Sequence, residues 1–95
     1  MQRFDVWVLV QFRESIHDPQ GSAVKKALHS LGFAEIDDVR IGKSIKLSIG
    51  SRDEADAREQ VERACKKLLA SPVTEDYSIF HIELIEAKKT PDPAA

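Results

Sequence analysis

Hydrophobic and polar residues alternate along residues 3–13, RFDVWVLVQFR, and this period of two predicts a β-strand. The apolar residues of one parity predict the face that packs on the core: Phe4, Val6, Val8, Val10 and Phe12. The opposite face carries Trp7 and Leu9, which are large side chains for a solvated surface. Either a loop covers them, or they are tolerated as exposed apolar side chains, or this second sheet face meets another subunit; we favour contact with another subunit.

The stretch Asp18-Pro19-Gln20-Gly21 predicts the start of a helix that continues from Ser22 to Leu31. Asp18 suits the N-cap because its carboxylate can accept from first-turn amides, and Pro19 suits the first helical position. An apolar stripe at helical spacing follows: Val24, Ala27, Leu28 and Leu31. Gly32 can take the left-handed conformation that ends a helix. Gly21 is unusual, because glycine inside a helix costs up to ~1 kcal/mol, and it suggests that another backbone approaches closely.

Residues 35–50, EIDDVRIGKSIKLSIG, predict a second β region whose apolar residues all have odd numbers. A hairpin with the three-residue loop Gly42-Lys43-Ser44 keeps these residues on one face, and so does one long strand bent at Gly42. The sequence leaves both alternatives open. A long strand would project beyond its own sheet and favour pairing with a second chain.

A second helix is predicted over residues 52–70, and a last strand over residues 77–86. Ser51 and Glu54 have the spacing of a capping box, and Pro72 ends the helix. The apolar stripe of this helix is Val61, Ala64, Cys65, Leu68 and Leu69. Alternation along the strand predicts that Phe80, Ile82 and Leu84 point inward. Ile79, His81 and Ile85 then lie on the other face, beside Trp7 and Leu9.

The predicted order is β-α-β-β-α-β, with two helices on one face of an antiparallel sheet. This is an α+β fold, a two-layer sandwich of ferredoxin-like topology, in a single domain over residues 1–87. Residues 88–95 are punctuated by proline and predict a disordered tail. Because one sheet face stays open and partly apolar, we expect self-association through Trp7, Leu9 and Ile79, giving a homodimer or homotetramer.

The charge pattern argues against nucleic acid as a partner, because 14 basic and 16 acidic residues are interleaved and give a net charge of −2. No apolar run approaches the ~20 residues that span a membrane, and no secretory signal pattern begins the chain. A single cysteine, Cys65, allows no internal disulfide. We therefore expect a cytoplasmic protein.

The sequence contains no recognisable catalytic constellation. His17, His29 and His81 lack metal-ligand spacing to one another or to Cys65, which lies on a helix stripe and predicts core packing. Phosphate-binding, nucleophile-elbow and zinc motifs are also missing. Three polar groups are unusual for pure scaffolding and are candidate contact sites: Asp18 to Gly21; Arg40, Gly42 and Lys43; and Glu75, Asp76 and Tyr77. These residues indicate a self-associating module that has no catalytic site and binds no cofactor.

Three segments resemble the PurS family, the small subunit of phosphoribosylformylglycinamidine synthase, over residues 1–87. They are Asp18-Pro19-Gln20-Gly21 with Ala27 to Leu31, then Asp38 to Lys43, and then Cys65 to Ala70 running on to Val73 and Glu75-Asp76-Tyr77. Their order and spacing are those of the family. The chain departs from the family pattern at Ser71, where asparagine is usual, and at Thr74, where an aliphatic residue is common.

The resemblance implies a role in purine biosynthesis. Formylglycinamide ribonucleotide, glutamine and ATP are converted to formylglycinamidine ribonucleotide, with ATP and Mg expected on the large subunit (PurL) and glutamine hydrolysis on a glutaminase subunit (PurQ). The small subunit bridges the two and aids ammonia transfer. On this basis we expect Asp18, Pro19, Gln20 and Gly21, with Arg40, Gly42 and Lys43, to contact the large subunit. The alternative is a stand-alone module that senses a small metabolite.

Overall fold

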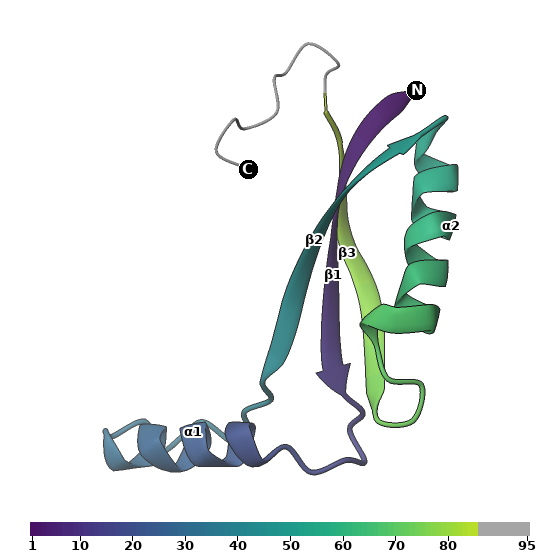
Figure 1. Cartoon of the computed structure of the whole chain (residues 1–95). Coiled ribbons are helices and arrows are strands. Elements are labelled where there is room, and N and C mark those ends of the chain that lie inside the picture. Colours follow the sequence, from purple (N-terminus) through teal and green to yellow (C-terminus); the bar gives the residue numbers. More distant parts are fainter. Residues whose placement is uncertain (86–95) are drawn as a thin grey trace, which may run out of the picture.

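The computed structural model describes residues 1–85 and shows a three-stranded antiparallel sheet with two helices (Figure 1). The elements in chain order are β1 (Gln2–Phe12), α1 (Pro19–Ser30), β2 (Gly42–Ser51), α2 (Glu54–Ala64), the π-helical turn η1 (Cys65–Leu69) and β3 (Glu75–Ile85). The strand order is β2-β1-β3. The α+β class is confirmed. The end of the predicted domain at residue 87 and the predicted tail, 88–95, lie outside the described residues.

Strand β1 is the centre of the sheet because it pairs with β2 along one edge and with β3 along the other. Four of its five predicted inward residues, Phe4, Val6, Val8 and Val10, are at most 3% exposed, whereas Phe12 at the strand end is only partly buried and lies outside the core cluster. The four buried residues form one core with Ala57, Val61 and Cys65 from the second helical segment. The alternation in the sequence therefore predicted the core face of this strand correctly.

The second β region forms the single strand β2. Ile45 pairs with Val8, and Leu47 pairs with Val6, so residues 45–47 pair with β1 rather than with residues 39–41. The hairpin alternative is wrong, and the long strand is shorter than expected because it begins only at Gly42. Residues 36–41 bond to α1 and its flanks instead: the Ile36 carbonyl lies 2.7 Å from His29 Nε2.

A β-bulge in β3 changes which side chains face the core. Trp7 is paired with His81 but Val8 with Ile79, so Phe80 is an extra residue in this strand. Ile79 consequently packs against the core, and Phe80 is 56% exposed. The predictions that Phe80 points inward and that Ile79 lies on the face of Trp7 are wrong, because one extra residue reverses the alternation.

Helix α2 begins later than predicted. Its N-cap is Asp53, whose carboxylate accepts from the Asp56 amide at 2.8 Å. Ser51 is instead fully buried at the end of β2 and donates its hydroxyl to the Asp56 carboxylate at 2.6 Å, so the predicted capping box is wrong. At its other end the helix widens into η1, which buries Ala70 and leaves Leu68 82% exposed.

Helix α1 differs from the expected arrangement because it extends away from the sheet (Figure 1). Its local structure is the one predicted: Asp18 is the N-cap, Pro19 opens the helix, and Gly32 has a φ of +99°. The Gly32 amide donates to His29 and the Phe33 amide donates to Leu28, which is a Schellman ending. Within one chain, α2 alone lies against the sheet, and the second helix of the expected sandwich has no sheet to cover.

Candidate interaction site at one end of the sheet

The polar segments singled out in the sequence meet where β1 ends and where β2 and β3 begin. Gln11 in β1 is opposite Gly42 on one side and opposite Asp76 on the other. A cavity of about 170 Å³ at this end is lined by residues from all three segments, among them Gln20, Gly42, Lys43 and Glu75. Groups that are up to 55 residues apart in sequence, from Gln20 to Glu75, thus form one continuous surface.

Asp18 supports this surface from inside. Its side chain is 3% exposed, and its two carboxylate oxygens accept from the amides of Gly21 at 3.0 Å and Ile41 at 2.6 Å. The Gly21 amide, and next the Ile41 amide, hold the pKa of the Asp18 carboxyl below its ordinary value. The charged carboxylate therefore connects the first turn of α1 to Ile41, directly before β2. Asp18 acts within the chain, where it positions Gly21 and Ile41.

Gly21 is required by a close approach of backbone. A Cβ at this position would lie 2.1 Å from the Val39 carbonyl oxygen, which no side chain permits. This confirms the expectation that the unusual glycine of the first turn allows another backbone to come near. The contact holds the segment that leads into β2 directly against α1.

Arg40 fixes the loop between β1 and α1. Its Nη2 group donates to the carbonyl oxygens of Arg13 at 2.8 Å, Ile16 at 2.9 Å and Phe12 at 3.3 Å. The guanidinium of this predicted contact residue therefore binds carbonyl oxygens of the chain's own backbone. Lys43 is exposed at the same end of the sheet.

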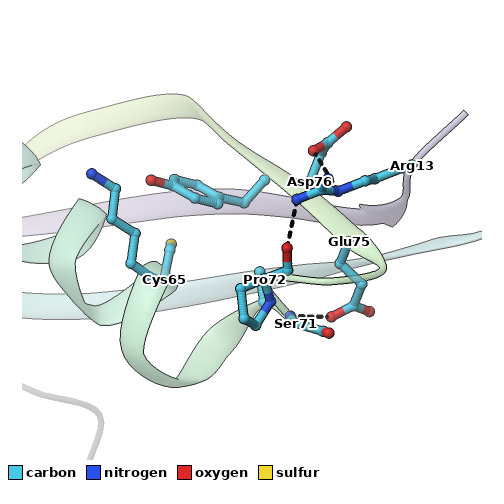
Figure 2. A pocket seen from close by; sticks show the side chains of 9 residues that line it. Arg13, Cys65, Ser71, Pro72, Glu75 and Asp76 are labelled. Atoms are coloured by element: carbon cyan, nitrogen blue, oxygen red, sulfur yellow. Dashed lines mark hydrogen bonds and ion pairs between the residues drawn. The ribbon is translucent and has the colours of Figure 1, made fainter.

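A second cavity of about 340 Å³ adjoins the first and shares Glu75 with it (Figure 2). Arg13 donates to the Pro72 carbonyl at 2.6 Å and lies 3.5 Å from the Asp76 carboxylate, while the Ser71 amide donates to Glu75 at 2.8 Å. Sequence reasoning missed Arg13 and Ser71 as parts of this site. The one signal for Arg13 was a charged residue directly after an apolar strand.

Tyr77 and Cys65 line the inner wall of this second cavity. The Tyr77 hydroxyl donates to Glu62 at 3.5 Å, and burial, followed by the Glu62 charge, raises the pKa of the phenol. Burial, followed by the same Glu62 charge, raises the pKa of the Cys65 thiol. A protonated thiol is a poor nucleophile, and Cys65 is fully buried in the core, where it packs with Ala57 and Val61.

The sheet face opposite the core carries an aromatic cluster. The rings of Trp7 and His81 lie 4.9 Å apart, and Lys46 Nζ lies 5.3 Å from the Trp7 ring centre. Lys46 also pairs with Asp5 at 3.5 Å. In residues 1–85 no group of three His, Cys, Asp or Glu side chains is placed to hold a metal ion, and no helix is long and apolar enough to cross a membrane.

Comparison with known proteins identifies relatives across nearly the whole described chain. The family model of PurS, phosphoribosylformylglycinamidine (FGAM) synthase, matches residues 5–83. The subunit PurS of this synthase from Bacillus subtilis is 46% identical over 85 residues, which are 90% of this chain and 99% of that protein. PurS of Thermus thermophilus aligns with a TM-score of 0.78 at 31% identity, covering 88% of this chain and 99% of that one. A chain of PurLQS from Thermotoga maritima aligns with a TM-score of 0.76 at 30% identity, covering 90% and 100%.

Proposed function

Since the chain belongs to the PurS family of phosphoribosylformylglycinamidine synthase subunits, we propose that it is the non-catalytic subunit that bridges the synthetase and glutaminase subunits of this enzyme. It would serve the conversion of formylglycinamide ribonucleotide, glutamine and ATP to formylglycinamidine ribonucleotide, and it would aid ammonia transfer between the other two subunits. The related PurLQS structure supports this role, because it holds a chain of the same fold in a complex. ATP and Mg belong to PurL in this proposal, and the location is the cytoplasm.

The observation that carries the proposal is the convergence of Gln20, Gly42, Lys43 and Glu75 on one cavity at the end of the sheet. Pro19 and Gln20 are exposed next to the buried Asp18, and Lys43 is exposed beside them, so this surface is available to PurL. The adjoining cavity with Asp76 and Tyr77 extends the same surface. On the opposite sheet face, Trp7 and Leu9 serve self-association.

A reconstitution tests the proposal directly. We expect glutamine-dependent product formation by PurL and PurQ to need this chain, whereas formation with added ammonia largely does not. At a limiting concentration of this chain, Lys43→Glu should lower the glutamine-dependent rate about tenfold, because a reversed charge at the contact opposes binding to PurL. Lys67→Glu, an exposed charge reversal on η1, is the matched control. A glutamine-dependent rate that is the same without this chain would overturn the proposal.

The alternative, a stand-alone metabolite sensor, is favoured by one observation, the 340 Å³ cavity with both charged and apolar lining. This volume is at the lower end of small-molecule sites, which are about 300–1,000 Å³. A ligand at a hundred times its Kd would stabilise the chain by roughly 2.7 kcal/mol. Thermal shifts with amino acids and nucleotides distinguish the two functions: the bridging role predicts none with the isolated chain.

A further inference from the structure

Arg13, directly after β1, binds the turn between η1 and β3 at two backbone positions. Its amide donates to the Thr74 carbonyl at 2.9 Å, and its Nη2 group donates to the Pro72 carbonyl at 2.6 Å. These two carbonyls flank Val73, whose exposed fraction is 74%. Arg13 therefore fixes the backbone on both sides of an exposed apolar side chain.

The turn is also closed by its own hydrogen bonds, which centre on Ser71. The Ser71 amide donates to the Glu75 carboxylate at 2.8 Å, and the Glu75 amide donates to the Ser71 carbonyl at 3.0 Å. The Ser71 hydroxyl accepts from the amides of Val73 at 3.3 Å and Thr74 at 3.4 Å. Residues 71–75 thus form a closed unit, and Arg13 joins this unit to the end of β1.

The Arg13 side chain has a second partner in β3, since its Nε lies 3.5 Å from the Asp76 carboxylate (Figure 2). Two nitrogens of one planar guanidinium therefore bind Pro72 and Asp76, and a lysine ammonium cannot reproduce this fork. The side chains of the Arg13–Asp76 pair are 45% and 72% exposed. Because an ion pair this exposed adds little to folding stability, its geometry favours a role in orienting the turn.

Arg13 also connects the turn to the surface that we propose for PurL. Its carbonyl accepts from Arg40 Nη2 at 2.8 Å, and the same nitrogen binds the Ile16 carbonyl in the loop before α1. The cavity that Arg13 lines shares Glu75 with the cavity that Lys43 lines. The turn and the proposed PurL surface are therefore continuous.

We propose that Arg13 is a positioning residue of the PurL contact. It holds residues 72–74 so that Val73 contacts an apolar surface of the same subunit that meets Lys43. A side chain whose backbone is already fixed loses less conformational entropy on binding, so the bonds of Arg13 strengthen the contact. This inference rests on the proposed function and extends its contact surface to the β3 side of the sheet.

The test measures the concentration of this chain that gives PurL and PurQ half of their maximal glutamine-dependent rate. Arg13→Ala keeps the backbone bond to Thr74 but loses Pro72 and Asp76, and we expect this concentration to rise at least tenfold. The rate at saturating chain should stay at the wild-type value, because no reacting group is removed. Arg13→Lys keeps the charge without the fork and should raise the concentration by a similar factor.

The matched control is Arg58→Ala, which removes an equally exposed arginine of α2. The Arg58 side chain is 46% exposed and lies 3.9 Å from the Glu54 carboxylate. This variant should keep the wild-type half-maximal concentration. A wild-type value for Arg13→Ala, or its restoration by Arg13→Lys, overturns the inference and leaves the bridging role intact.

Measurements on the isolated chain separate positioning from loss of the fold. The thermal unfolding midpoint of Arg13→Ala should stay within about 5 °C of the wild type, because the lost ion pair is exposed. The backbone order parameters of Val73 and Thr74 should fall, because the turn loses its side-chain bonds to Arg13. Wild-type order parameters in Arg13→Ala would contradict the positioning role.

Val73→Asp tests the contact without involving the fold, because Val73 is already exposed. We expect it to raise the half-maximal concentration at least tenfold, and its combination with Arg13→Ala should add little, because both changes act on one contact. A wild-type value for Val73→Asp overturns the inference alone. If the wild-type chain itself leaves the glutamine-dependent rate unchanged, the proposed function fails and this inference fails with it.

Discussion

At the scale of single residues, three residues determine how α1 begins. Gly21 leaves room for the Val39 carbonyl, and Asp18 offers two acceptors to two amides in a buried position. Arg40 satisfies three carbonyls of the loop before α1. These residues stand out in the sequence as candidates for partner contact, and the structure shows that they first organise their own chain. Gln20 and Lys43 are exposed beside them, and we propose these two side chains for contact with a partner.

Gly21→Ala should loosen α1 while leaving the sheet intact. Its Cβ would overlap the Val39 carbonyl oxygen, and relief of the clash would displace backbone that Asp18 holds at Gly21 and Ile41. We expect the free energy of local opening at α1 to fall by roughly 1–3 kcal/mol, measured by amide hydrogen exchange over residues 24–31. Ser22→Ala, the exposed next residue, is the control. Wild-type protection of α1 in Gly21→Ala would contradict the close approach.

At the scale of elements, the departures from the predicted pattern have local causes. The extra residue Phe80 reverses the alternation in β3, and η1 turns Leu68 away from the core at the end of α2. In α1 the helix itself is as predicted, but its attachment at Asp18 and Gly21 decides its direction. An element can therefore be predicted correctly while the surface that it covers is not.

The attachment of α1 to β2 should depend on pH. Because the folded chain lowers the pKa of Asp18, its stabilising effect is fully present above the ordinary carboxyl value of 3.8 and is lost as the pH falls through the lower folded value. We expect the Ile41 amide to lose protection in that acid range. In Asp18→Asn the side chain can accept with one oxygen only, so the Ile41 amide should have low protection that does not change with pH. A pH-independent Ile41 amide in the wild type would refute the assignment.

At the scale of the whole molecule, apolar side chains stay at least partly exposed on two surfaces of one chain: the sheet face of Trp7 and Leu9, and helix α1 with Val24 and Leu31. A small domain rarely leaves both open, because each costs hydration free energy that association recovers. We therefore expect association to cover at least one of them. The polar end of the sheet, where α1 and β2 begin, is the surface that we propose for contact with the other subunits.

Trp7→Asp tests the first of these surfaces. In this variant the new carboxylate would be buried in the interface between copies. The mass of the assembly that the chain forms by itself should therefore fall, as measured by light scattering after gel filtration. The partly exposed position of Trp7 in the single chain means that the sheet itself should persist. An assembly of wild-type mass for Trp7→Asp would show that this face stays free.

The sequence by itself determined the features that depend on near neighbours. Alternation along residues 3–13 identified the central strand and its core face, and the Asp18-Pro19 start and Gly32 end bounded α1, because caps, turns and periodicity act over a few residues. Three matching segments were enough to indicate the family. Only the tertiary structure decided that β2 begins at Gly42, that a bulge turns Phe80 outward, and that three polar segments meet at one end of the sheet. It also decided that α1 points away from the sheet of its own chain, because long-range contacts of Asp18, Gly21 and Arg40 set the direction of the helix.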